Sequence, residues 1–266
     1  MSQELVFDQD HYQALNTARG LALRQLLPHL RIALPSAKPT AIDVACGTGY
    51  FSNVLCEVGF DVLGVDVRAT NVAQARSRFP SLKFAIADAE ELQLMRQGTF
   101  DLVLCFGLLY HLENPFRVIR NLRSLADKIL VVESMCAPGD DPSMQLLDES
   151  DAADQGLNYV AFYPTESCIV KMLFRAEFPF VYGITIPPDH RDFREEKLRR
   201  RARTMLVASN DRLNTTALRP LQEPIRPLDI WSVRPTSWRR GFSRVACSVR
   251  KFKSWVLSSS GGRGKT

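Results

Sequence analysis

The feature that most constrains the fold of this chain is a regular alternation of apolar and helical segments between about residues 38 and 209. The apolar segments are bounded by turn residues and are predicted as strands at 41–45, 60–67, 82–87, 100–106 and 129–133. Helices are predicted between them at 50–58, 70–79 and 116–126. Because strands joined through helices pair in parallel, the sequence predicts an α/β fold with a doubly wound, Rossmann-like sheet.

Local signals mark the ends of several predicted helices. Asn114 followed by Pro115 is typical of a helix start, and Thr70 and Thr165 are predicted N-caps of two other helices. Gly59 stands where a helix ends in the left-handed conformation. These signals place the boundaries of the helices that separate the strands.

The two ends of the chain are predicted to differ from this pattern. Segments 178–186 and 204–209 are predicted as a terminal pair of strands, giving a mostly parallel sheet with a terminal antiparallel strand. Helical periodicity at 10–30 predicts a helix that covers the site or a sheet edge. We therefore divide the chain into three parts. They are an N-terminal helical cap (1–37), a central domain (38–210) and a basic, partly disordered C-terminal extension (211–266).

Charge is unevenly distributed along the 266 residues, whose net charge is +5. The extension 211–266 carries twelve Lys and Arg against three acids, so the residues before it are acidic overall. Apolar residues recur at helical spacing within 238–257, at Trp238, Phe242, Val245, Val249, Phe252 and Val256. A basic amphipathic helix of this kind suits packing on an acidic core or contact with an anionic membrane surface. Nucleic acid is the least favoured partner.

Composition excludes several classes of protein. No apolar run approaches the ~18–20 residues of a membrane-spanning helix, and the first residues lack the features of a secretory signal. The six cysteines are scattered without metal-ligand spacing, so we expect neither a metal site nor a disulfide framework. The expected location is cytoplasmic, with peripheral contact to a membrane through the basic extension as an alternative.

Three acids and two glycines follow the ends of predicted strands. Asp43 precedes a tight turn with Gly47 and Gly49, while Asp66 ends the second strand and Asp88 follows the third. Ligands of doubly wound sheets bind at the carboxyl ends of strands, where an acid ~20 residues after the glycines grips ribose hydroxyls. The set suggests a nucleoside-bearing cofactor, although each acid could instead cap the helix that follows it.

The glycine turn also resembles a known motif. Residues 43–49, Asp-Val-Ala-Cys-Gly-Thr-Gly, resemble motif I of the class I S-adenosylmethionine-dependent methyltransferases. Val65-Asp66, Ala87-Asp88-Ala89 and Phe100-Asp101-Leu102-Val103 match the later motifs in order and spacing. The resemblance covers about residues 38–210 and implies S-adenosylmethionine as the cofactor.

The family implies a role for each matching residue. Gly47 and Gly49 would cradle the methionine part of the cofactor, and Asp66 would hold the ribose. Asp88 and Ala89 would meet the adenine. An acid at Asp43 suits a cofactor with a cationic amino-acid end.

Residues at the end of the fourth predicted strand and after it indicate a branch of this family. The family implies that Cys105 and Phe106 line the site near the sulfonium. Segments 107–115 and 158–165 are similar to the branch containing the tRNA wobble-uridine carboxymethyltransferases, which use carboxy-S-adenosylmethionine. Tyr110 matches a residue that helps to hold the extra carboxylate. Leu112 and Glu113 stand where that branch has two arginines, so we expect ordinary S-adenosylmethionine.

His111 is the leading candidate for a catalytic base. A hydroxyl or amine acceptor must lose a proton, and an ordinary imidazole pKa of ~6.5 suits neutral pH. Tyr110 and Glu133 are weaker candidates. Alternatively, His111 only fixes the start of the next helix through a loop carbonyl.

The insert 135–164 is expected to form a lip of the acceptor pocket. It has no Lys or Arg and carries six acids, at Asp140, Asp141, Asp148, Glu149, Asp151 and Asp154. A negative rim repels phosphate, which counts against a nucleic-acid substrate without excluding it. Tyr159, Phe162 and Tyr163 either stack on an acceptor or pack under the lip.

Three functions follow from these features. The first is an S-adenosylmethionine-dependent methyltransferase acting on an oxygen or nitrogen of a small-molecule or saccharide-like acceptor. The second is a tRNA-modifying alkyltransferase, and the third is a non-catalytic cofactor-binding domain attached to membranes. The acidic lip favours the first over the second.

Overall fold

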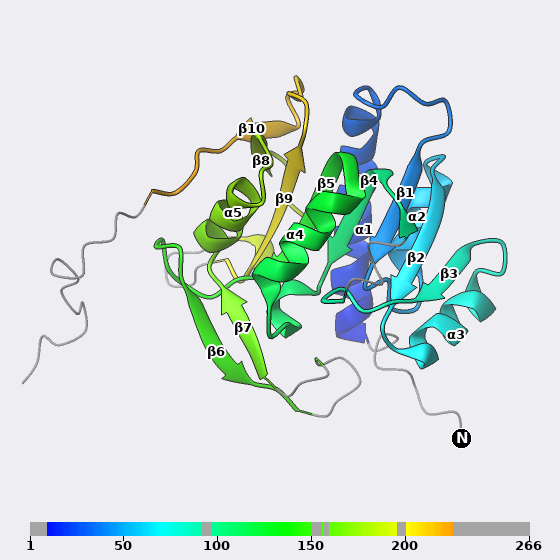
Figure 1. Cartoon of the computed structure of the whole chain (residues 1–266), viewed down its shortest axis with the longest axis horizontal. Coiled ribbons are helices and arrows are strands. Elements are labelled where there is room, and N and C mark those ends of the chain that lie inside the picture. The colour runs from blue at the N-terminus through cyan, green and yellow to red at the C-terminus, as the bar shows by residue number, and fades with distance from the viewer. Residues whose placement is uncertain (1–9, 92–96, 151–155, 157–159, 196–200, 226–266) are drawn as a thin grey trace, which may run out of the picture. The chain divides into compact units, whose positions relative to one another are not determined.

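The computed structural model describes residues 10–91, 97–150, 156, 160–195 and 201–225. In these ranges, eight strands form one sheet with the order β10-β8-β9-β5-β4-β1-β2-β3, and β6 and β7 form a separate hairpin (Figure 1). The strands that alternate with helices are β1 (Thr40–Val44), β2 (Asp61–Asp66), β3 (Lys83–Ile86), β4 (Phe100–Phe106) and β5 (Ala126–Met135). The later strands are β6 (Met144–Asp148), β7 (Val160–Pro164), β8 (Phe180–Ile184), β9 (Arg203–Ser209) and β10 (Leu218–Pro220).

The strand directions confirm the predicted class of fold. β1 pairs in parallel with β2 and β4, and β3 and β5 extend this parallel arrangement on either side. β9 is antiparallel to both β5 and β8, and β10 is antiparallel to β8. The sheet is therefore mostly parallel with an antiparallel end. It also continues beyond residue 210, because β10 belongs to the part assigned from sequence to the extension.

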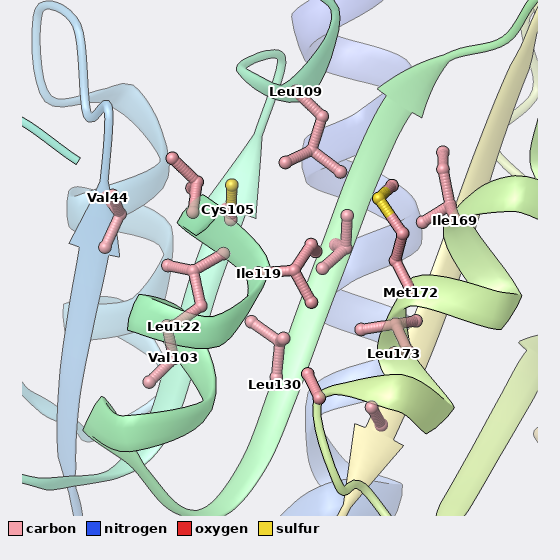
Figure 2. Close-up of a cluster of buried hydrophobic side chains, with 14 of the residues drawn as sticks. Val44, Val103, Cys105, Leu109, Ile119, Leu122, Leu130, Ile169, Met172 and Leu173 are labelled. Carbon is pink, nitrogen blue, oxygen red and sulfur yellow. The ribbon is translucent and has the colours of Figure 1, made fainter. Parts of the chain in front are cut away.

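Helices cover both faces of the sheet. They are α1 (Asp10–Arg31), α2 (Tyr50–Glu57), α3 (Ala69–Arg78), α4 (Pro115–Leu125) and α5 (Glu166–Arg175), with the short 3-10 turns η3 (Leu109–His111) and η4 (Arg191–Phe193). Side chains of α4 and α5 pack with one face in a core that includes Ile119, Leu122 and Met172 (Figure 2). Figure 1 shows α1 and α2 on the other face of the sheet. Leu23 and Leu27 of α1 and Val54 and Leu55 of α2 belong to a second core.

One local prediction was wrong. Thr70 is not the N-cap of α3, because the helix begins at Ala69 with Arg68 as its N-cap residue. The Asp66 carboxylate instead accepts hydrogen bonds from the Arg68 N–H and the Asn71 amide at this helix start. The hairpin β6–β7 was also not predicted, since all of β6 after Met144 is exposed and no apolar alternation marks it. By contrast, the predicted Thr165 cap of α5 is confirmed, with its Oγ1 accepting from the Cys168 N–H.

The predicted amphipathic helix at 238–257 lies outside the described residues and stays a prediction. None of the helices in the described ranges is long and apolar enough to span a membrane.

Candidate active site

A cavity of about 550 Å³ opens where the carboxyl ends of β1, β2 and β4 meet. This is the edge of a doubly wound sheet at which ligands are expected. Its lining includes seven residues predicted for the site, namely Gly47, Asp66, Asp88, Ala89, Phe106, Tyr110 and His111. Thr48 and Tyr50, on either side of Gly49, also line it. The volume is typical of a small-molecule or cofactor site.

Seven of the ten predicted site residues thus line the cavity. The other three, Asp43, Gly49 and Cys105, are not among its lining residues.

The glycine turn forms the wall of the cavity beside β1. Gly47 and Gly49 both have positive φ, at 54° and 89°, a conformation that a residue with a side chain rarely adopts. No atom lies within 4 Å of the position that a Cβ on Gly47 would take, so the backbone there faces open space. At Gly49 a Cβ would come within 2.9 Å of the Phe84 ring. The first glycine therefore exposes backbone to a ligand, and the second allows close packing.

Asp66 links this turn to the start of α3. Its side chain is buried, with one oxygen accepting from the Gly47 N–H at 2.9 Å. The other oxygen accepts from the Arg68 N–H and the Asn71 amide. A carboxylate has about four acceptor positions, so the oxygen bound to Gly47 keeps capacity for a ligand hydroxyl. Asp66 thus orders the turn and can accept a further hydrogen bond from a ligand.

Asp88 and Ala89 lie on the next wall, after β3. The Asp88 carboxylate accepts from the Glu90 N–H at 2.9 Å, and the buried Asn121 amide donates to the Ala89 carbonyl at 2.8 Å. These bonds fix the backbone that borders the cavity at both residues. The arrangement suits the edge and face of a flat heterocycle such as adenine.

Asp43 of β1 and Cys105 of β4 are buried in the sheet. Asp43 is buried and accepts a hydrogen bond from the Ser52 hydroxyl at 2.7 Å. Burial raises the pKa of Asp43 to about 7, although this hydrogen bond opposes the shift. Cys105 is fully buried in the core drawn in Figure 2, where burial raises the pKa of its thiol. Neither residue is among those that line the cavity, because both side chains are buried within the sheet.

Tyr110 and His111 form another part of the lining, in the turn η3. Their rings lie 4.1 Å apart between centroids, and Tyr163 of β7 contacts Tyr110 edge-on at 5.9 Å. The His111 Nδ1 lies 2.5 Å from the Glu149 Oε1. The insert therefore contributes Glu149 to this part of the site, as well as the lining residue Gly156.

A buried ion cluster was missed from the sequence. Glu133 is fully buried, and its two oxygens accept from Arg19 of α1 at 2.7 Å and from Arg203 of β9 at 2.8 Å. Burial alone would raise the pKa of Glu133, but the two guanidiniums outweigh it and hold the pKa below its ordinary value. Arg203 also donates to the Tyr110 hydroxyl at 3.2 Å. Glu133 is thus engaged in an ion cluster, which argues against its role as a base.

One signal could have found Arg203. An antiparallel strand brings its first residue to the edge where parallel strands end, and Arg203 pairs in register with Met135 at the end of β5. Arg19 had no comparable signal, because its contact with Glu133 spans 114 residues of sequence.

Comparisons with known proteins find similarity to methyltransferases. Residues 42–128 match the family model described as "Methyltransferase domain". A ubiquinone biosynthesis O-methyltransferase of Xanthomonas campestris is 32% identical over 99 residues, which are 36% of this chain and 41% of that protein. A tRNA U34 carboxymethyltransferase of Shewanella woodyi is 27% identical over 168 residues, covering 58% of this chain and 47% of that protein. The chain thus matches less than half the length of either relative.

Solved structures show the same fold. The N-terminal domain of EvdMO1, solved with SAH bound, has a TM-score of 0.59 at 19% identity, covering 76% of this chain and 84% of that chain. Magnesium protoporphyrin IX methyltransferase from Synechocystis PCC 6803, solved with bound SAM, has a TM-score of 0.52 at 20% identity. That match covers 76% of this chain and 85% of the other.

The fold and the glycine turn are similar to those of the class I S-adenosylmethionine-dependent methyltransferases, and residues 42–128 match a methyltransferase-domain model. Within that class, the chain is similar to the branch that includes the tRNA U34 carboxymethyltransferases. The residues present fit S-adenosylmethionine, because open space at Gly47 adjoins the acids Asp66 and Asp88 in one cavity.

Proposed function

We propose that the protein transfers a methyl group from S-adenosylmethionine to an oxygen or nitrogen of a small-molecule or saccharide-like acceptor. The observation that carries the proposal is that one cavity joins the cofactor-side residues Asp66 and Asp88 to His111. A cavity of about 550 Å³ leaves room for a second small molecule beside part of a cofactor.

The cofactor supplies an activated methyl carbon, so the protein mainly has to align the acceptor and exclude water. Asp66 and the Gly47 turn hold the ribose and the amino-acid end, while Asp88 and Ala89 border the adenine. When bound, S-adenosylmethionine would supply the methyl group and its sulfur would keep the electron pair of the carbon–sulfur bond, so the acceptor would have to lose a proton. The acceptor proton passes to His111, which afterwards releases it to solvent.

Methyl-labelled S-adenosylmethionine tests this function. The full chain is incubated with either a small-metabolite extract or bulk tRNA, and label is followed into each fraction. We expect label in a small molecule and a rate that falls roughly 10²–10⁴-fold in His111→Ala, as for loss of a general base. Label in tRNA alone, or none in either fraction, would contradict the proposal.

The contact between Arg203 and Tyr110 favours a second candidate, carboxymethyl transfer to tRNA. Both residues line the cavity, and the guanidinium supplies a cation that Glu113 does not. The acidic residues of the insert count against a tRNA acceptor. Mass spectrometry of the cofactor that copurifies distinguishes the two, since only the second candidate requires the carboxylated form.

A further inference from the structure

Glu149 directly follows β6 within the acidic insert 135–164 and contacts His111. We infer that Glu149 is a positioning residue that fixes the tautomer and orientation of His111 for proton transfer. This inference rests on the proposed methyl transfer and assigns a specific task to one acid of the insert.

Both carboxylate oxygens of Glu149 are engaged. Oε1 lies 2.5 Å from the His111 Nδ1, and Oε2 accepts from the Gly156 N–H at 2.7 Å. The side chains of His111 and Glu149 are 16% and 8% exposed, so water screens the contact only weakly. Two bonds in different directions fix the orientation of the carboxylate.

Gly156 makes this arrangement specific to the local sequence. A Cβ at Gly156 would overlap the carbonyl oxygen of His111 and Oε2 of Glu149. Only glycine lets the insert approach both residues this closely. The Gly156 N–H therefore donates to the same Glu149 carboxylate that contacts His111.

The contact determines which ring nitrogen can act. A carboxylate at Nδ1 favours a proton on that nitrogen, which leaves the Nε2 lone pair as the acceptor of the substrate proton. After transfer, the carboxylate stabilises the positive ring. Without Glu149, the ring can take the other tautomer, which has no lone pair at Nε2.

Other ionisable groups near His111 must be considered in any pH experiment. Tyr110 of η3 stacks on the ring, and Tyr163 of β7 contacts Tyr110. Arg203 of β9 places its guanidinium 5.3 Å from the Tyr110 ring centroid. Glu113 lines the same cavity. A change confined to Glu149 must therefore be compared with a change of equal charge elsewhere in the insert.

Asp148→Asn is the matched control, because Asp148 precedes Glu149 and is exposed. Imidazole ¹⁵N spectra of the full chain should show the Nδ1–H tautomer of His111 in the wild type and in Asp148→Asn. Glu149→Gln should lose this preference, and Gly156→Ala should weaken it by displacing the carboxylate. An unchanged tautomer in Glu149→Gln would overturn the inference.

Label transfer to the metabolite extract provides the second readout. Glu149→Gln should lower kcat about 10- to 100-fold, part of the ~10²–10⁴ that a positioned base contributes, with unchanged S-adenosylmethionine affinity. The acid limb of its rate–pH profile should move about one unit lower, because the positive ring loses its carboxylate. A changed KM with unchanged kcat and pH profile would assign Glu149 a structural role instead. If the wild-type protein transfers no label, the proposed function is refuted. The ¹⁵N spectra still test whether Glu149 fixes the tautomer of His111.

Discussion

Glu133→Gln is the substitution whose effect follows most directly from the structure. The carboxylate of Glu133 is fully buried and bridges Arg19 and Arg203, whose side chains are 8% and 6% exposed. A glutamine keeps one oxygen acceptor but turns an NH₂ group toward the other guanidinium. Two buried positive charges then lose the charge that compensates them.

The expected loss of unfolding free energy is about 3–5 kcal/mol, the usual cost of removing one partner from a buried ion pair. The chain contains a control with similar geometry in Arg24 and Glu57, whose nitrogen and oxygen lie 2.6 Å apart. Their side chains are 36% and 48% exposed, so Glu57→Gln should cost only about 0–1 kcal/mol. The difference in burial alone therefore predicts that Glu133→Gln loses several times more unfolding free energy than Glu57→Gln.

Urea unfolding at pH 7.5 measures both losses on the same chain. The stabilisation from Glu133 is present above its ordinary pKa of ~4.3 and is lost as pH falls through its lowered pKa. The gap between wild type and Glu133→Gln should accordingly narrow below about pH 4. Equal losses in the two variants at pH 7.5 would refute the reasoning from burial.

Three further predictions follow from the site. Asp66→Ala should weaken S-adenosylmethionine binding by about 1–3 kcal/mol, roughly 5- to 150-fold, because hydrogen-bonding groups lose their partner; calorimetry showing unchanged affinity would remove Asp66 from the site. Because the pKa of Asp43 is raised to about 7, its contribution to stability is lost as pH rises from about 4 to 7. The melting temperature of Asp43→Asn relative to that of the wild type should therefore be higher at pH 8 than at pH 5. Gly64→Ala should destabilise by about 1–3 kcal/mol, since its Cβ would lie 2.5 Å from the Phe84 ring and 2.8 Å from the Ser52 hydroxyl; an unchanged melting temperature would contradict this.

Local sequence signals were sufficient for the central sheet and for one side of the cavity. Apolar segments predicted β1 to β5, and the positive-φ positions Gly47 and Gly49 lie in the turn expected of them. Asp66 and Asp88 lie at the same edge because parallel strands end together. These features depend on residues close in sequence or on strand direction.

Contacts between distant segments could not be predicted in this way. The bonds of Glu133 to Arg19 and Arg203 span 114 and 70 residues. Arg19 has no local signal, and Arg203 could be inferred only from the antiparallel pairing of β9 with β5. In the sequence, Glu149 is one of six acids of the insert. Only the folded structure distinguishes it from the exposed Asp148, because it places Glu149 against His111. Such pairings depend on tertiary packing, which periodicity does not encode.

The structure of a complex with S-adenosylhomocysteine tests the central claim most directly. We predict that the ribose hydroxyls contact Asp66, that the adenine lies beside Asp88 and Ala89, and that the sulfur faces the part of the cavity lined by Tyr110 and His111. A ligand bound elsewhere, or one whose sulfur is separated from His111 by protein, would contradict the account.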